Sequence, residues 1–136
     1  MNPIPVTCVV LLHEGKVMAA QRAAQMDLPG CWEFPGGKVE EGESPETCLI
    51  REVLEELSIT IRITGALTPV LHAYPSKTIQ LLPFLATWDS GTIRLAEHAQ
   101  LRWLGREELY SVDWAPADLP IVHELSANWV NLVTSP

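Results

Sequence analysis

Residues 36–59 hold the side chains most able to do chemistry, because acids, glycines and a lysine are crowded together there. On an α-helix each residue advances by about 100°, so Glu52, Glu55 and Glu56 share one arc of a predicted helix. Arg51 is expected to lie to one side of that arc and to leave their mutual repulsion unrelieved. Clustered carboxylates favour a divalent cation such as Mg²⁺. A solvated acidic surface is the alternative interpretation of the same pattern.

The segment that precedes these glutamates supports the prediction of a cation site. Gly36 and Gly37 permit a close approach of the backbone, and Lys38 adds a point charge suited to a phosphate. Carboxylates, a metal ion and a cation on a glycine loop are the parts that phosphoryl chemistry needs, because that chemistry depends on positioning and charge neutralisation.

The elements that must position these groups follow from the apolar pattern. Residues 45–57 are predicted to form the acidic helix, with Ser44 as its N-cap and Pro45 in the first helical position. A second helix is predicted over residues 118–132. The apolar residues expected to pack the acidic helix against the core are Ile50, Val53, Leu54 and Leu57.

Strands are expected between and around these helices, which predicts an α/β or α+β class with a mixed β-sheet sandwiched between helices. Pro83 falls inside one apolar run and is expected to make that strand an edge or a bulge. Residues 26–37 are predicted to be loop around a short extended piece, and residues 106–109 a brief helical turn. The predicted strands are residues 6–12, 17–21, 60–68, 78–88 and 99–104.

Length and composition narrow the function classes. A chain of 136 residues predicts a single domain spanning 1–136, and a net charge of −8 argues against a general nucleic-acid binder. Cys8, Cys31 and Cys48 fit neither a disulfide framework nor a zinc spacing, which favours a reducing cytoplasm. No apolar run is long enough to cross a membrane, and no signal peptide is expected.

The spacing of residues 37–59 resembles the Nudix box: Gly, five residues, Glu, seven residues, Arg-Glu-aliphatic, one residue, Glu-Glu, one residue, Gly, aliphatic. One position departs, since Ser58 stands where the family has a helix-ending glycine, at a cost of roughly 1 kcal/mol for a left-handed conformation. The matching residues are Gly37, Glu43, Arg51, Glu52, Val53, Glu55, Glu56 and Ile59.

Most of the remaining chain is similar to the MutT and CTP pyrophosphohydrolase branch of that family, through "QRAAQMDLPGCWEFPGGK", "AEHAQLRWL" and "WAPADLP". The resemblance implies the Nudix fold and an Mg²⁺ cofactor, with Mn²⁺ as a possible substitute. It implies that Glu52 activates the attacking water and that Glu43 pairs with Arg51 in a structural role. The implied metal ligands are Glu52, Glu55, Glu56, Glu97 and the Gly36 carbonyl.

The same resemblance implies the substrate contacts. Arg22 and Lys38 would hold phosphates, while Phe34 is open between packing on a base and packing in the core. His98, beside Glu97, is open between a packing and a site role. Asp118 is open between capping the second helix and reading the base. An ionised carboxylate only accepts hydrogen bonds, so a base-reading Asp118 favours the exocyclic amino group of cytosine. The alternative is a buried Asp118 that keeps its proton and donates as well.

The leading function hypothesis is therefore a nucleoside triphosphate pyrophosphohydrolase that converts (d)NTP to (d)NMP and pyrophosphate. Cytidine or modified and oxidised nucleotides are its expected substrates, in the sanitation of the nucleotide pool. One alternative is a Nudix hydrolase of ADP-ribose or nucleotide sugars. The other is a non-catalytic Nudix-fold sensor, although such domains usually lose the box acids. No nucleic-acid or membrane partner is expected, and the chain is expected to be a monomer or a homodimer.

Overall fold

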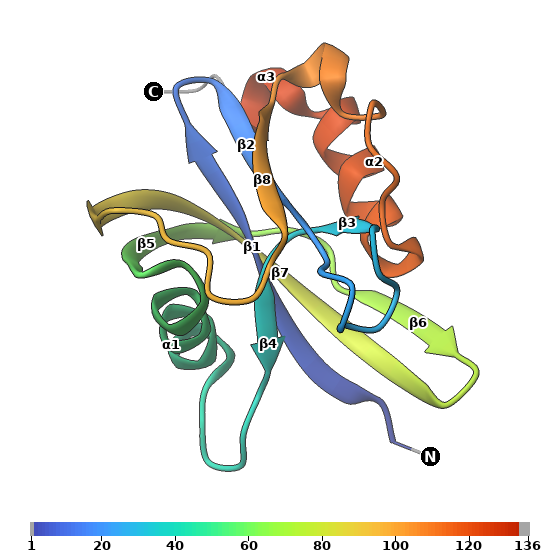
Figure 1. Cartoon of the computed structure of the whole chain (residues 1–136). Coiled ribbons are helices and arrows are strands. Elements are labelled where there is room, and N and C mark those ends of the chain that lie inside the picture. The colour runs from blue at the N-terminus through green and yellow to red at the C-terminus, as the bar shows by residue number, and fades with distance from the viewer. Residues whose placement is uncertain (1, 134–136) are drawn as a thin grey trace.

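The structure is a computed structural model that describes residues 2–133. It confirms the predicted mixed sheet between helices (Figure 1). No helix within the described residues is both long and apolar enough to span a membrane. In chain order the elements are β1 (Ile4–His13), β2 (Lys16–Gln21), β3 (Trp32–Glu33), β4 (Gly36–Lys38), α1 (Pro45–Leu57), β5 (Ile59–Ala66), β6 (Val70–Tyr74), β7 (Lys77–Gly91), β8 (Gln100–Leu104), the 3-10 turns η1 (Arg106–Glu108) and η2 (Pro116–Asp118), α2 (Leu119–Ala127) and α3 (Trp129–Leu132).

Strand β1 lies at the centre of the sheet. It pairs in parallel with β7 and antiparallel with β2 and β4, while β7 also pairs with β5 and β6, and β2 with β3 and β8. Alternate residues of β1 enter opposite cores: Val9 and Leu11 pack with α1, whereas Cys8 and Val10 pack on the side of α2 and α3. The continuous apolar run of β1 is explained by this burial on both faces.

Strand β7 corrects the expectation for Pro83. The strand lies inside the sheet, and Pro83 is paired with Cys8 of β1. On the other side, the partner of β7 changes from β6, opposite Leu81, to β5, opposite Phe84. The Pro83 carbonyl accepts from the backbone N–H of Leu67 at this junction. Because the nitrogen and carbonyl of a strand residue face the same way, the missing N–H falls where no regular ladder bond is needed. Strand β6 was not predicted.

Helix α1 has the predicted bounds, but its packing face differs from the prediction. Val53 and Leu57 are fully buried, whereas Ile50 and Leu54 are 41% and 50% exposed. With Glu52 at zero, the buried apolar residues of α1 extend to about 140°, and Ile50 and Leu54 fall beyond, at about 160° and 200°. The helix is thus rotated so that its acidic arc turns partly toward the protein.

The predicted second helix is interrupted. Asn128, with φ of −120°, separates α2 from α3, and its side-chain amide donates to the carbonyl of Glu124. Ile121, Val122 and Leu125 of α2 cover the sheet face opposite α1. The helices thus lie on opposite sides of the sheet, α1 on one side and α2 and α3 on the other (Figure 1).

Candidate active site

The acidic helix begins and ends as its sequence predicts. The Ser44 hydroxyl accepts from the backbone N–H of Thr47 at 3.1 Å. At the other end Ser58 has φ of +61°, the left-handed conformation that the box glycine would adopt, and its N–H donates to the Leu54 carbonyl. A left-handed residue with a side chain is strained, so Ser58 closes α1 at a cost that glycine would avoid.

The three box glutamates do not share one environment. The side chains of Glu52 and Glu56 are only 17% and 15% exposed, whereas that of Glu55 is 58% exposed. Two carboxylates are therefore turned under the adjoining loops, and one lies on the surface.

Arg51 partly relieves the repulsion among these acids, which corrects the expectation that it would not. Its guanidinium binds both carboxylate oxygens of Glu43 at 2.7 and 2.9 Å, the ion pair implied by the Nudix resemblance. This contact lowers the pKa of Glu43 to about 2. The remaining nitrogen, Nη1, lies 3.4 Å from Glu52 and 3.3 Å from Glu55. Arg51 thus anchors the loop to α1 and offsets part of the charge on the acidic arc.

The glycine loop brings the backbone against the acidic helix. A side chain on Gly36 would overlap the backbone of Thr7 and Cys8, and one on Gly37 would overlap the carboxylate of Glu52. Gly36 is therefore required for the close approach of β4 to β1, whereas a side chain at Gly37 would require the Glu52 carboxylate to move. The consequence is a backbone segment lying directly beside a half-buried carboxylate.

Glu56 is the most perturbed acid of the box. Burial, followed by the negative charges of Glu52 and Glu33, raises its pKa to about 8. Burial also raises the pKa of Glu52. Within residues 2–133, the buried Oε2 of Glu56 has no hydrogen-bond partner. A carboxyl oxygen buried among other acids is suited to receive either a proton or a cation.

The acids do not form a preassembled cation site. Among the described residues, no three His, Cys, Asp or Glu side chains gather closely enough to hold a metal ion. Glu97 is exposed, yet its charge contributes to raising the pKa of both Glu52 and Glu56. Its loop is tied to the end of α1, since the N–H groups of Arg94 and Ala96 donate to the carbonyls of Leu57 and Glu56. Binding a cation would require these carboxylates to draw together.

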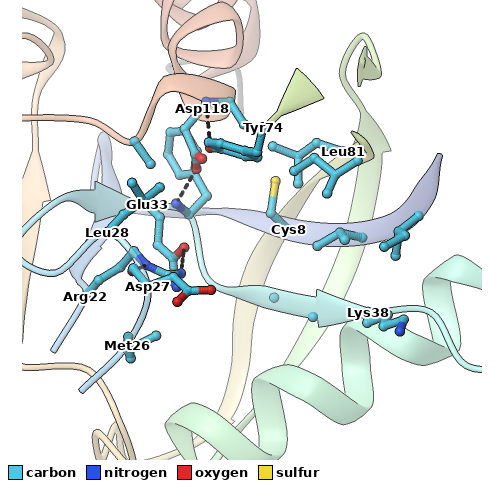
Figure 2. A pocket seen from close by; sticks show the side chains of 18 of the residues that line it. Cys8, Arg22, Met26, Asp27, Leu28, Glu33, Lys38, Tyr74, Leu81 and Asp118 are labelled. Atoms are coloured by element: carbon cyan, nitrogen blue, oxygen red, sulfur yellow. Dashed lines mark hydrogen bonds and ion pairs between the residues drawn. The ribbon is translucent and has the colours of Figure 1, made fainter. Parts of the chain in front are cut away.

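A cavity of about 660 Å³ opens beside this acidic face. Figure 2 shows Cys8, Tyr74 and Asp118 grouped together, with Arg22 and Glu33 nearby and Lys38 farther along β4. Glu52, Glu55 and Glu97 are not among its lining residues. The predicted site residues that line it are Arg22, Phe34, Gly36, Lys38, Glu56 and Asp118.

The two predicted phosphate-binding cations differ in their partners. Arg22 is held by Glu33, with Nη1 and Oε1 2.7 Å apart, and its Nε donates to the backbone carbonyl of Asp27. Lys38 is exposed and makes no ion pair with the described residues. Lys38 can therefore pair with a phosphate directly, whereas Arg22 can do so through Nη2 while it keeps both contacts.

Phe34 and Asp118 are joined at the inner end of the cavity. The Phe34 ring is 2% exposed and lies 4.7 Å from the Trp114 ring, which places it in the core. The backbone N–H of Phe34 donates to Oδ2 of Asp118 at 2.8 Å. Asp118 makes no side-chain cap bond to α2, so the interpretation of Asp118 as an N-cap is wrong. Its carboxyl instead connects two segments 84 residues apart.

The structure favours the protonated form of Asp118, which the sequence left open. Burial raises the pKa of Asp118 to about 8, with the Phe34 N–H bond opposing and the charge of Glu33 adding to the rise. The carboxyl therefore holds a proton at neutral pH and can donate as well as accept. The argument that an acceptor-only Asp118 favours cytosine does not apply at neutral pH.

Sequence reasoning missed Glu33 and Tyr74 as cavity residues and left the role of His98 open. Glu33 contacts both Arg22 and His98, and the Tyr74 hydroxyl accepts from the N–H of Ala117 at 3.3 Å. His98 is buried between Glu33 and Glu56. The only local signal was the place of Glu33 directly before the Phe-Pro-Gly-Gly loop, because the other contacts join distant segments.

Comparisons with known proteins show which family the chain resembles in sequence and fold. Residues 1–125 match the NUDIX domain family. The chain is 35% identical over 127 residues to the CTP pyrophosphohydrolase of Escherichia coli K12, covering 93% of this chain and 94% of that protein. It is 40% identical over 79 residues to the 8-oxo-dGTP diphosphatase of Proteus vulgaris, covering 58% and 70%. The solution structure of the E. coli ORF135 protein aligns with a TM-score of 0.82 at 34% identity, covering 95% and 92%.

Proposed function

This chain belongs to the Nudix family, and on that premise we propose that it is a nucleoside triphosphate pyrophosphohydrolase of the nucleotide pool. It converts a (d)NTP and water to the (d)NMP and pyrophosphate. The observation that carries the proposal is that one cavity is lined by two unlike carboxyls. We call the part around Glu56 the acidic end and the part around Asp118 the base end. The phosphate chain of a nucleotide, with its metal ion, needs one environment, and the nucleobase needs a different one.

The acidic end suits a divalent cation, which Nudix hydrolases generally use. The unpartnered Oε2 of buried Glu56 supports this assignment. When bound, Mg²⁺, or Mn²⁺ in its place, supplies charge neutralisation for the phosphates and lowers the pKa of a water molecule. The groups assigned to hold the cation are Glu52, Glu55, Glu56, Glu97 and the Gly36 carbonyl.

The remaining roles in the reaction are assigned to side chains of this protein. The half-buried carboxylate of Glu52 lies beside the Gly37 backbone. We assign it to take the proton from the attacking water. Lys38 binds a phosphate from the rim of the cavity. Arg22 keeps its contact with Glu33 through Nη1 and orders that wall, and its Nη2 is assigned to a phosphate.

The base end suits a ring that presents both a donor and an acceptor. A protonated Asp118 can accept from the cytosine amino group and donate to the adjacent ring nitrogen, and it can equally match an oxidised guanine edge. Tyr74 and Leu81 supply apolar surface beside it. We therefore assign cytidine and oxidised nucleotides as the substrate class. Phe34 supports this end from the core instead of stacking on the base.

We place this activity in a single domain working in the cytoplasm. The three cysteines, Cys8, Cys31 and Cys48, are all free thiols in the structure, which supports a reducing compartment.

The test is a panel of normal, oxidised and methylated nucleoside triphosphates with Mg²⁺, together with ADP-ribose and a nucleotide sugar. The expected products are equimolar monophosphate and pyrophosphate from cytidine or oxidised nucleotides. Release of inorganic phosphate alone, or hydrolysis restricted to ADP-ribose or the sugar nucleotide, would contradict the proposal.

A further inference from the structure

The loop of residues 92–99 carries a buried histidine, His98, that lies outside the strands of the sheet. His98 is one of the three polar or charged residues counted as buried among those described, and its side chain is 1% exposed. The loop around it is held independently by backbone bonds, from Ala96 to Glu56 and from Ala99 to Gln21. Burying an imidazole is costly unless its nitrogens are matched. Its position therefore calls for an explanation.

The two ring nitrogens of His98 face two different acids. Nε2 lies 2.8 Å from Oε2 of Glu33, within hydrogen-bond distance. Nδ1 lies 3.8 Å from Oε2 of Glu56, beyond that distance. These last two atoms, His98 Nδ1 and Glu56 Oε2, are the buried side-chain atoms without a hydrogen-bond partner among the described residues.

The imidazole is a rigid spacer between the two acids. Glu33 is itself fixed by Arg22 at 2.7 Å, so one end of the spacer is anchored to the cavity wall. The other end abuts the Glu56 carboxyl and limits how far it can turn away from the cavity. His98 lines the cavity together with Glu56, but its ring nitrogens face Glu33 and Glu56, so we expect the histidine to act through these neighbours.

We propose that His98 is a positioning residue that holds the Glu56 carboxyl in the orientation used to bind the divalent cation. The inference rests on the proposed function for its kinetic consequence, but not for its effect on metal binding. Groups that orient a metal ligand from behind typically change metal affinity or activity by about 10-fold to 100-fold when replaced. A histidine that only fills space would change stability and nothing else.

Two substitutions separate the contacts of the ring. The amide nitrogen of glutamine can take the place of Nε2, so His98→Gln keeps a donor for Glu33 and removes the group facing Glu56. The shorter asparagine places a polar atom near Nδ1, so His98→Asn keeps the group facing Glu56 and loses the tie to Glu33. His123→Gln is the matched control, because His123 is exposed on α2 and contacts Tyr110, away from the cavity.

The first measurement is Mn²⁺ binding by the full chain without nucleotide, followed through the electron paramagnetic resonance signal of free Mn²⁺. We expect His98→Gln to weaken binding by about 10-fold, and His98→Asn to weaken it less. The second is steady-state hydrolysis of a triphosphate, in which His98→Gln should lower kcat by about 10-fold with a smaller change in KM. The control should match the wild type in both assays.

The outcome that overturns the proposal is wild-type Mn²⁺ affinity in both folded His98 variants, whatever their melting temperatures. Equal losses in the glutamine and asparagine variants that follow their losses of stability would overturn it as well. If the unmodified chain hydrolyses no nucleoside triphosphate, the proposed function fails, and the Mn²⁺ measurement still decides the role of His98.

Discussion

The two ends of the cavity each contain a buried carboxyl whose pKa is raised to about 8, yet the surroundings of the two groups differ. Around Glu56 the additional causes are the like charges of neighbouring acids, and its Oε2 lacks a hydrogen-bond partner among the described residues. Burial is the largest cause at both groups, but around Asp118 Glu33 is the one acid that adds to the rise, Arg22 opposes it, and Oδ2 accepts the Phe34 N–H.

This difference indicates what each carboxyl can do. A carboxyl surrounded by other acids gains most by exchanging its proton for a cation that all of them share. A carboxyl that accepts a backbone N–H and has one acid and one cation nearby keeps its proton and is available to a neutral ligand. Similar raised pKa values thus correspond to a metal-binding group in one case and a base-reading group in the other.

The largest effect is expected at the acidic end. Glu56→Gln should lower turnover with Mg²⁺ by at least about 100-fold, because an amide cannot replace an anionic metal ligand. The fold should persist, since Glu56 is largely protonated at neutral pH without metal and glutamine has nearly the same shape. Steady-state rates and thermal melting check both points.

The control for this substitution is Glu46→Gln, an exposed acid in the first turn of the same helix. It should leave turnover unchanged. Near-normal turnover by Glu56→Gln at saturating Mg²⁺ would show that this face of α1 is not the metal site.

A smaller effect is expected for Glu97, which approaches the same acids from a distant loop. Glu97→Gln should lower kcat by roughly 10-fold and raise the Mg²⁺ concentration needed for half-maximal rate. Glu107→Gln, an exposed acid of η1, is the control. A Mg²⁺ titration identical to the wild type would assign Glu97 to the solvated surface.

At the base end a few-fold effect on substrate choice is expected. Above about pH 8 Asp118 loses its proton and becomes an acceptor only, so the ratio of dCTP to 8-oxo-dGTP turnover should rise. Asp118→Asn cannot ionise and should lack this part of the rise. Both proteins experience the same ionisation of the substrates, so the difference between them isolates Asp118.

Stability should also depend on pH in the absence of metal. Both carboxyls have a pKa of about 8 when folded, and their ordinary pKa values are 4.5 for Glu56 and 3.8 for Asp118. Between about pH 4 and about pH 8 the folded chain therefore binds more protons than the unfolded chain, and stability falls as pH rises. Melting in EDTA at intervals from about pH 5 to about pH 8 measures this slope.

Asp118→Asn should flatten the slope, and Mg²⁺ should raise stability most at the alkaline end, where it need not displace a proton from Glu56. A stability that is flat or rises over this interval would contradict both raised pKa values.

The smallest effect is expected at the end of α1, outside both regions. Ser58→Gly should raise the free energy of unfolding by about 1 kcal/mol, because glycine accepts the left-handed conformation without strain. Turnover should not change. Chemical denaturation measures the gain, and a loss of stability would show that the Ser58 side chain makes a compensating contribution.

Features determined by local chemistry were predictable from the sequence. The apolar run of β1, the cap of α1 at Ser44 and the spacing of the box acids depend on neighbouring residues, and each was found where expected. Features determined by distant contacts were not. The rotation of α1 buries Glu56 and exposes Leu54, and no helical pattern alone indicates which arc the loop of residues 92–99 will cover.

The candidate site divides in the same way. Arg51 and Glu43 lie eight residues apart, and their pairing was implied by the box. The partner of Asp118 lies 84 residues away, so its local position before a helix suggested a cap that the structure does not contain. Pro83 is similar, because its tolerance inside β7 depends on where two other strands meet.

The most direct test of the division between the two ends is one set of rates: wild type, Glu56→Gln and Asp118→Asn, each with dCTP and 8-oxo-dGTP at about pH 7 and about pH 9. The account predicts that Glu56→Gln slows both substrates by the same factor and leaves their ratio and its pH dependence unchanged. It predicts that Asp118→Asn retains most turnover and loses the rise in the dCTP ratio at the higher pH. A ratio altered by Glu56→Gln, or a rise that survives in Asp118→Asn, would contradict it.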